Sequence, residues 1–324
     1  MNLIKKMAIG ITMVLAFVAG IFGFSKTASA FSVTPMKQLI SLTPGQEYTG
    51  EVTAFAPLDA TGTTYYEASV VPLTVNDSNN NYSIVTTEMT DRTDIVNWVT
   101  LKTVNGETAE NGVIKGSFGP GEQVNFTYTI KVPKDALGGG QYFAVGIVSV
   151  SNPNAGSEGT AVGIAERVAI YSVVYAEIAG DIVASGSISD NSTPSFVLEP
   201  KISASFVAKN DGNTHLRAVS YLQVFPFFSD EEVYTNEEDP TLTDVLPDTT
   251  RYIVQKWDGA PAVGIFKVRQ TAYFESSSDN KSVMEKMVII CPIWLMVIAL
   301  IVIVAIVVAL IAFVKRSKNR KDSV

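Results

Sequence analysis

The 324-residue sequence contains one histidine, His215, and one cysteine, Cys291. Cys291 lies inside a long apolar run, so the rest of the chain cannot form a disulfide. A single imidazole without a nearby thiolate cannot provide the usual ligands of zinc. Neither a Gly-x-Ser-x-Gly elbow nor a Ser-x-x-Lys motif lies near His215, so the sequence gives no support to a serine-based catalytic triad. The sequence therefore predicts no enzyme, no catalytic residue and no metal or cofactor.

Basic residues are scarce in the middle of the chain. Residues 31–285 hold 15 lysines and arginines against 31 aspartates and glutamates. Such an acidic surface repels phosphate backbones, so nucleic acid is excluded as a partner.

Charged residues are absent from 288–314. At 1.5 Å per residue this run is about 40 Å long, enough to cross a hydrocarbon core of about 30 Å. Residues 315–324 form a basic tail, which predicts that the C-terminus is cytoplasmic and that the preceding region is extracellular. The alternative, a buried core helix, does not need to be apolar on every side. The sequence predicts a single-pass type I membrane protein.

The N-terminus has the pattern of a secretory signal. Two lysines precede an apolar run from Met7 to Phe24, and an Ala-x-Ala sequence follows at residues 28–30. This pattern predicts a signal peptide over residues 1–30, with an uncleaved N-terminal anchor as the alternative.

Helical periodicity is absent between the two ends. Apolar residues instead alternate with polar ones, as over 124–132, 168–178 and 202–208, and Gly, Pro, Asn and Asp form turns between such runs. This alternation is typical of strands with one buried and one solvent-exposed face. The fold class predicted is all-β: two immunoglobulin-like antiparallel β-sandwich domains and a single transmembrane α-helix. The predicted boundaries are 31–180 for the first domain, 181–274 for the second, 275–287 for a polar stalk and 288–314 for the helix.

Three consecutive glycines occupy positions 138–140. A phosphate-binding loop would continue into Lys-Ser or Lys-Thr and a helix, whereas here Gln141, Tyr142 and Phe143 begin an alternating strand. Glycine also permits the positive φ of a tight connection. We interpret the segment as the turn of a hairpin.

Two other motifs resemble functional sites. The acidic segment 229–240 could supply oxygen ligands to Ca²⁺, but its spacing lacks the glycine of an EF-hand, and a solvated hairpin tip is favoured. The sequence LPDTT at 246–250 resembles a sortase signal, but Thr250 replaces the glycine and folded chain separates it from the membrane run.

Aromatic residues could line a binding surface. They are Tyr65, Tyr66, Trp98 and Trp257, and the sequence FPFF at 225–228. Because aromatic residues on alternating strands more often face the core, we favour core positions for them.

Several motifs resemble the WxL-interacting proteins of Gram-positive bacteria. These are LTPGQEYTGEV at 42–52, NWVTL at 97–101, GPGEQVNFTYTIKVP at 119–133 and ALGGGQYFAVGI at 136–147. The family is similar in layout, with a signal peptide, two Ig-like domains, a C-terminal membrane helix and a basic tail. The resemblance implies a bacterial cell-surface protein whose first domain associates with peptidoglycan and whose second associates with partner surfaces. It assigns no binding residue, and the second domain departs from the family pattern.

The function predicted is non-enzymatic binding to peptidoglycan or to other cell-surface proteins, from an extracellular Ig-like ectodomain anchored by its own helix. The alternative is an assembly factor or scaffold, similar to a pilus chaperone, that lends an exposed edge strand to an exported protein. Residues 166–178 are the candidate strand. A sensor is disfavoured because the predicted cytoplasmic tail has only ten residues.

Overall fold

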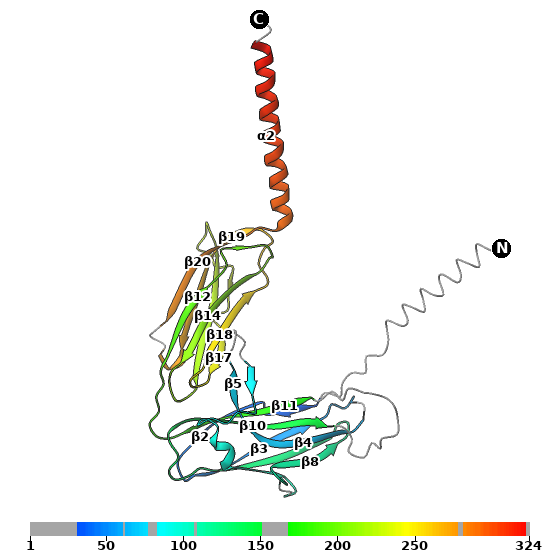
Figure 1. Ribbon diagram of the computed structural model, residues 1–324, viewed down its shortest axis with the longest axis vertical. Coiled ribbons are helices and arrows are strands. Elements are labelled where there is room, and N and C mark those ends of the chain that lie inside the picture. The colour runs from blue at the N-terminus through cyan, green and yellow to red at the C-terminus, as the bar shows by residue number, and fades with distance from the viewer. Residues whose placement is uncertain are drawn as a thin grey trace, which may run out of the picture.

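The computed structural model describes residues 31–60, 62–76, 83–106, 109–150, 168–277 and 281–321. It contains two β-sandwiches that meet at an angle and a long helix that leaves the second sandwich at its far end (Figure 1). The predicted signal peptide at 1–30 lies outside the described residues.

The first sandwich consists of two sheets. One sheet has the order β1-β3-β9-β7, and the other has the order β2-β11-β10-β4-β8. Their strands are β1 (Ser32–Thr34), β2 (Lys37–Leu42), β3 (Glu47–Phe55), β4 (Thr64–Pro72), β7 (Val99–Thr103), β8 (Val113–Phe118), β9 (Gln123–Lys131), β10 (Gly139–Val150) and β11 (Ala169–Ile178). A short hairpin, β5 (Thr74–Asn76) with β6 (Ser83–Val85), and a 3₁₀ helix, η2 (Asp94–Trp98), complete the domain.

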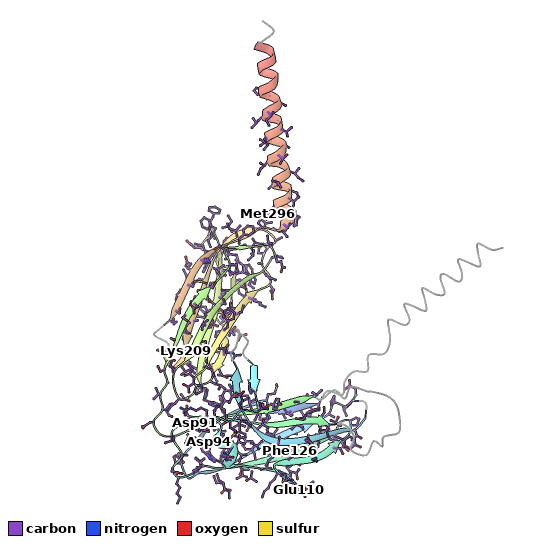
Figure 2. All side chains as sticks on the ribbon, in the orientation of Figure 1. Asp91, Asp94, Glu110, Phe126, Lys209 and Met296 are labelled. Atoms are coloured by element: carbon purple, nitrogen blue, oxygen red, sulfur yellow. The ribbon has the colours of Figure 1, made fainter. Side chains whose placement is uncertain are left out.

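The alternating sequence explains why this sandwich forms. On β9, Phe126, Tyr128 and Ile130 are fully buried and belong to one core cluster. Phe143 of β10 contacts Tyr128 edge-to-face, with ring centroids 5.5 Å apart. Figure 2 labels Phe126 within the first sandwich. Each strand thus contributes every second side chain to the space between the sheets.

The chain crosses from one sheet to the other near its beginning. Strand β1 pairs antiparallel with β3 in the first sheet, whereas β2 pairs in parallel with β11 in the second. Met36 and Pro35 lie at the crossing, where the Met36 carbonyl accepts a hydrogen bond from the Val173 N–H. The first strand segment therefore ties the two sheets of the sandwich together.

The second sandwich has a three-stranded sheet, β12-β14-β18, and a six-stranded sheet in which β13, β20, β19, β15 and β16 follow one another and β17 also pairs with β15. Its strands are β12 (Gly186–Ser192), β13 (Phe196–Val197), β14 (Ile202–Asn210), β15 (Leu216–Pro226), β16 (Tyr234–Thr235), β17 (Thr241–Val245), β18 (Thr250–Trp257), β19 (Gly264–Phe274) and β20 (Ser282–Ile290), with a 3₁₀ turn, η3 (Glu275–Ser277). Two core clusters fill the space between these sheets. The all-β, Ig-like prediction is confirmed.

The predicted polar stalk at 275–287 is wrong. Its second half and the first residues of the predicted helix form β20, which pairs with β19 along nine residues. Val288 and Ile290 are 1% exposed and belong to the core of the second sandwich. These apolar residues continue directly into the apolar helix, so hydropathy alone does not show where the strand ends.

The C-terminal helix α2 covers Ile293–Lys321 and not 288–314. Its segment Ile293–Phe313 is 21 residues long, has a mean hydropathy of 3.6 and is not buried by the rest of the protein. A helix this apolar on all sides has the length and composition to span a membrane.

Candidate functional site

The three glycines lie at the junction between the sandwiches. Gly139 and Gly140 begin β10, whereas β9 belongs to the opposite sheet, so the predicted hairpin is wrong and the connection crosses between sheets. The Gly140 N–H donates to the carbonyl of Asn213 in the second sandwich at 2.7 Å. Gly139 has φ of +121°, and a Cβ there would lie 2.7 Å from the same carbonyl oxygen. The glycines therefore permit two backbones to touch, which is an established use of glycine.

Asn213 connects three segments at this junction. Its side-chain amide donates to the Asp181 carbonyl at 2.7 Å and to the Gly138 carbonyl at 3.5 Å. Its side-chain oxygen accepts from the Val183 N–H at 2.7 Å. Asn213 thus holds the first sandwich, the linker and the second sandwich in one arrangement.

An ion-pair network also crosses the junction. Asp244 of β17 accepts hydrogen bonds from Lys37 of β2 and, at 3.4 Å, from Arg217 of β15. Burial alone would raise the pKa of the Asp244 carboxyl, but the two cations outweigh it and hold that pKa below its usual range. Lys37 also lies 4.4 Å from the centroid of the Tyr175 ring. Sequence reasoning missed this network, because residues 37 and 244 are far apart in the chain.

His215 lies in the same junction, directly before β15. Its ring contacts Tyr175 and Tyr142 of the first sandwich edge-on, at 5.3 and 6.1 Å between centroids. Burial lowers the pKa of His215, and Lys37 and Arg217 act in the same direction against Asp244 and Glu177. Its Nδ1 is buried and without a hydrogen-bond partner among the described residues. The histidine therefore packs against the tyrosine rings of the first sandwich, and among the described residues its Nδ1 makes no hydrogen bond of the kind that a catalytic triad requires.

A cavity of about 340 Å³ lies beside the junction. Tyr142 and Leu73 of the first sandwich and Leu246 of the second form an apolar cluster at its wall. Asp91 and Arg92 line the same cavity, and Figure 2 labels Asp91 at the end of the first sandwich that lies nearest the second. The LPDTT segment therefore begins with a residue that is packed between domains, since Leu246 is 3% exposed.

The candidate edge strand at 166–178 has an unpaired outer side over only part of its length. Strand β2 covers Val173–Ile178 of β11 by parallel pairing. Ala169–Ser172 of β11 pair with β10 on one side, and no described strand pairs with their other side. We call Ala169–Ser172 the open edge. Residues 166 and 167 lie outside the described residues.

The backbone of the open edge faces outward at two residues. The Val173 N–H points away from β10, because it donates to the Met36 carbonyl. Backbone groups alternate sides along a strand, so those of Ala169 and Tyr171 also point away from β10. Exposed apolar side chains follow along the same margin, where Met36 is 70% and Leu39 51% exposed.

The aromatic residues are divided between core and surface. Tyr66 is 4% exposed and Trp98 packs against the core of the first sandwich. Trp257 stacks on Tyr234, with ring centroids 5.2 Å apart, and packs against the core of the second. Phe228 contradicts the core prediction, because it is 90% exposed.

The acidic segment 229–240 forms a surface loop around the short strand β16. Asp230 pairs with Lys267, at 2.7 Å, and Glu232 accepts a hydrogen bond from Gln223. Among the described residues, no three His, Cys, Asp or Glu side chains come together as metal ligands would.

No protein-family model and no curated protein matches the sequence, so the resemblance to WxL-interacting proteins stays a prediction. Solved structures match this chain with low TM-scores and low sequence identity. The E. coli chaperone DraB matches with a TM-score of 0.35 and 8% identity, over 80% of this chain and 96% of that chain. The class 5 fimbriae chaperone CfaA matches with a TM-score of 0.33 and 10% identity, over 79% of this chain and 99% of that chain.

A third match is the Salmonella enterica SafA pilin in complex with the SafB chaperone, with a TM-score of 0.31 and 10% identity, over 82% of this chain and 98% of that chain. TM-scores this low support no conclusion about this chain. The function has to be inferred from this chain's own residues.

Proposed function

We propose that the protein is a membrane-anchored, non-enzymatic binding protein that holds an extended segment of another cell-surface protein along the open edge. The observation that carries this proposal is the unpaired outer side of Ala169–Ser172, among the described strands, where β11 extends beyond the end of β2. An extended peptide can add a strand to such an edge, since main-chain hydrogen bonds supply affinity and neighbouring side chains supply selectivity.

The chemistry of the other sheet margins favours this edge over them. On β8 the Lys115 side chain is 74% exposed and its ammonium pairs with Glu67 at 3.1 Å, and β18 carries exposed Lys256. Charged side chains on an edge discourage pairing with another chain. On β2, by contrast, Lys37 is engaged by Asp244, and the exposed residues beside it are Met36 and Leu39. The margin formed by the open edge and β2 is therefore suited to an apolar, strand-like partner.

Helix α2 supports the anchoring part of the proposal, because the apolar segment Ile293–Phe313 has the length of a membrane span. We propose a type I orientation with the sandwiches outside the cell, on the basis of the basic residues that follow the apolar segment. The resemblance to WxL-interacting proteins supports the same class of cell-surface protein.

An assembly factor would use the same edge for a transient contact, whereas a scaffold would keep its partner. The lifetime of the complex separates the two. A pilus-chaperone-like role predicts exchange of the bound segment for another strand, and a scaffold predicts none.

The test is capture of exported proteins by the full-length protein in lipid nanodiscs, compared between Tyr171→Pro and Tyr171→Thr. Proline removes the outward N–H of residue 171, and threonine keeps it in a strand-compatible residue. We expect the wild type and Tyr171→Thr to retain a partner and Tyr171→Pro to lose it, with hydrogen exchange of the wild type at 169 and 171 slowed only in the complex. Matching melting curves of the two variants serve as the folding control.

Purified peptidoglycan is the second arm of this experiment. Retention on peptidoglycan without a protein partner, or a protein partner that Tyr171→Pro binds equally well, contradicts the proposal. The first of these outcomes would favour wall attachment.

A further inference from the structure

Three loops of the second sandwich carry exposed apolar side chains at the end where the helix begins. Leu198 lies in the β13–β14 loop and is 44% exposed, Phe228 lies in the loop after β15 and is 90% exposed, and Val263 lies in the β18–β19 loop and is 47% exposed. We call Leu198, Phe228 and Val263 the apolar rim. None of the three residues is needed to fill the core, so the rim requires another explanation.

Strand pairing places the rim beside the start of the helix. Gly264, which follows Val263, pairs with Ile290, the last residue of β20. Val197, which precedes Leu198, also pairs with Ile290. Phe227 donates its N–H to the Ile265 carbonyl at 2.9 Å, which holds the Phe228 loop at the same end.

The link between β20 and α2 consists of Cys291 and Pro292 alone. Three residues span at most about 11 Å, so Ile290 lies within that distance of Ile293. The apolar segment from Ile293 to Phe313 has 21 residues, a length of about 31 Å, which matches a hydrocarbon core of about 30 Å. When this segment spans a bilayer, Ile293 lies at the hydrocarbon boundary. Ile290 and the rim then lie at the depth of the lipid head groups.

An apolar groove extends from the rim along the helix. Leu198 and residues of the first helical turns, including Ile293 and Met296, line a volume of about 600 Å³. Figure 2 shows Met296 just beyond the loops of the second sandwich. Trp294, in the first turn, is 58% exposed, and tryptophan is enriched at membrane interfaces.

We propose that the apolar rim is a lipid-binding surface that rests in the outer interface of the bilayer and fixes the tilt of the ectodomain. This inference depends on the membrane anchor of the proposed function. Phe228 and Leu198 enter the interface as the apolar residues of interfacial proteins do. Asp230, paired with Lys267, and its acidic neighbours Glu231 and Glu232 stay in water, so the contact is shallow.

The experiment places one environment-sensitive fluorophore at a time on the full-length protein in phosphatidylcholine vesicles. Cys291 is first replaced by serine, because it is the only cysteine in the chain. Single cysteines then replace Phe228 in the rim, Met296 in the helix and Leu58 on the first sandwich. Leu58 is the matched control, because it is 89% exposed and lies outside the second sandwich. Quenchers attached near the lipid head groups or deep in the acyl chains report the depth of each position.

We expect quenching at position 296, which lies about 4.5 Å inside the hydrocarbon boundary, quenching of at least twofold by the head-group quencher at position 228, and none at position 58. Quenching at 296 with none at 228 overturns the rim proposal and leaves the anchor intact. Absence of quenching at 296 overturns both the rim proposal and the membrane anchor.

Hydrogen exchange of the unmodified protein is the independent measurement. The loops at 198–201 and 227–233 should exchange several-fold more slowly in vesicles than in a detergent that leaves them exposed, and equal rates overturn the proposal.

Discussion

Several single residues at the domain junction make contacts that involve both sandwiches. Asp244 accepts from two cations, Asn213 bonds to three segments, and Gly139 lies against a carbonyl of the other sandwich. Each of these residues has neighbours from both domains. A change at any of them therefore tests the junction rather than either sandwich alone.

Asp244→Asn should destabilise the protein by about 1–3 kcal/mol at neutral pH, because Lys37 and Arg217 lose their partly buried counter-charge. The pKa of Asp244 is lower in the folded protein than in the unfolded chain. The contribution of the Asp244 carboxylate to the free energy of unfolding is therefore complete above the unfolded pKa of about 3.9. It is lost as the pH falls through the folded pKa.

The measurement is denaturant unfolding of wild type and Asp244→Asn as a function of pH. The difference in unfolding free energy should be constant near neutrality and shrink at strongly acidic pH. A difference that persists unchanged into strong acid would show that the carboxylate charge is not the cause.

Gly139→Ala should cost about 1–3 kcal/mol from its positive φ, and more from the approach to the Asn213 carbonyl. Gly62 is the matched control, because it has φ of +100° and a methyl group added there would meet nothing within 4 Å. Urea unfolding of both alanine variants isolates the contact. Equal losses in the two variants would mean that the junction tolerates the methyl group.

The sequence is informative at this scale only for local chemistry. The glycines at 138–140 indicate tight backbone geometry, but nothing adjacent in the sequence indicates that their neighbour is Asn213. The same holds for Lys37 and Asp244, which topology brings together across 207 positions. Pairings of this kind depend on how whole domains meet, which side-chain periodicity does not encode.

At the scale of elements, alternation predicts strands well and their neighbours poorly. The runs at 124–132, 168–178 and 202–208 correspond to β9, β11 and β14. The covering of β11 by β2 was not predictable, because β2 reaches it only after the chain crosses between sheets. Strand β20 was missed for a different reason: its apolar end merges with the helix in any hydropathy profile.

A fragment that ends at residue 274 should therefore fail to fold its second sandwich, whereas one that ends at 292 should fold it. Loss of β20 removes Val288 and Ile290 from the core, at about 1.5–3 kcal/mol each, and exposes the β19 ladder. Fluorescence of Trp257 and resistance to proteolysis of residues 186–274 report the outcome. A stable second sandwich in the shorter fragment would show that β20 is dispensable.

At the scale of the whole molecule, the junction makes the two sandwiches one angled body (Figure 1). Asn213→Ala should release the linker and broaden the distribution of distances between the sandwiches, because all its side-chain bonds join segments of different domains or the linker. Small-angle scattering or distance measurements between spin labels on each sandwich detect this change.

Asn236→Ala is the matched control for this prediction. The Asn236 side chain accepts from the Leu222 N–H inside the second sandwich, at 2.8 Å. This variant should lower the stability of that domain and leave the distance distribution unchanged. An unchanged distribution in Asn213→Ala would place the rigidity in the ion-pair network instead.

The direct passage of β20 into the helix has a mechanical consequence. The linker from the first sandwich enters the second at Gly186, at one end, and β20 leaves it at the other. A pull between the first sandwich and helix α2 therefore acts along β20 and β19, parallel to both strands. Their hydrogen bonds share the load and must break together, not in sequence like a zipper. The second sandwich is built to withstand tension.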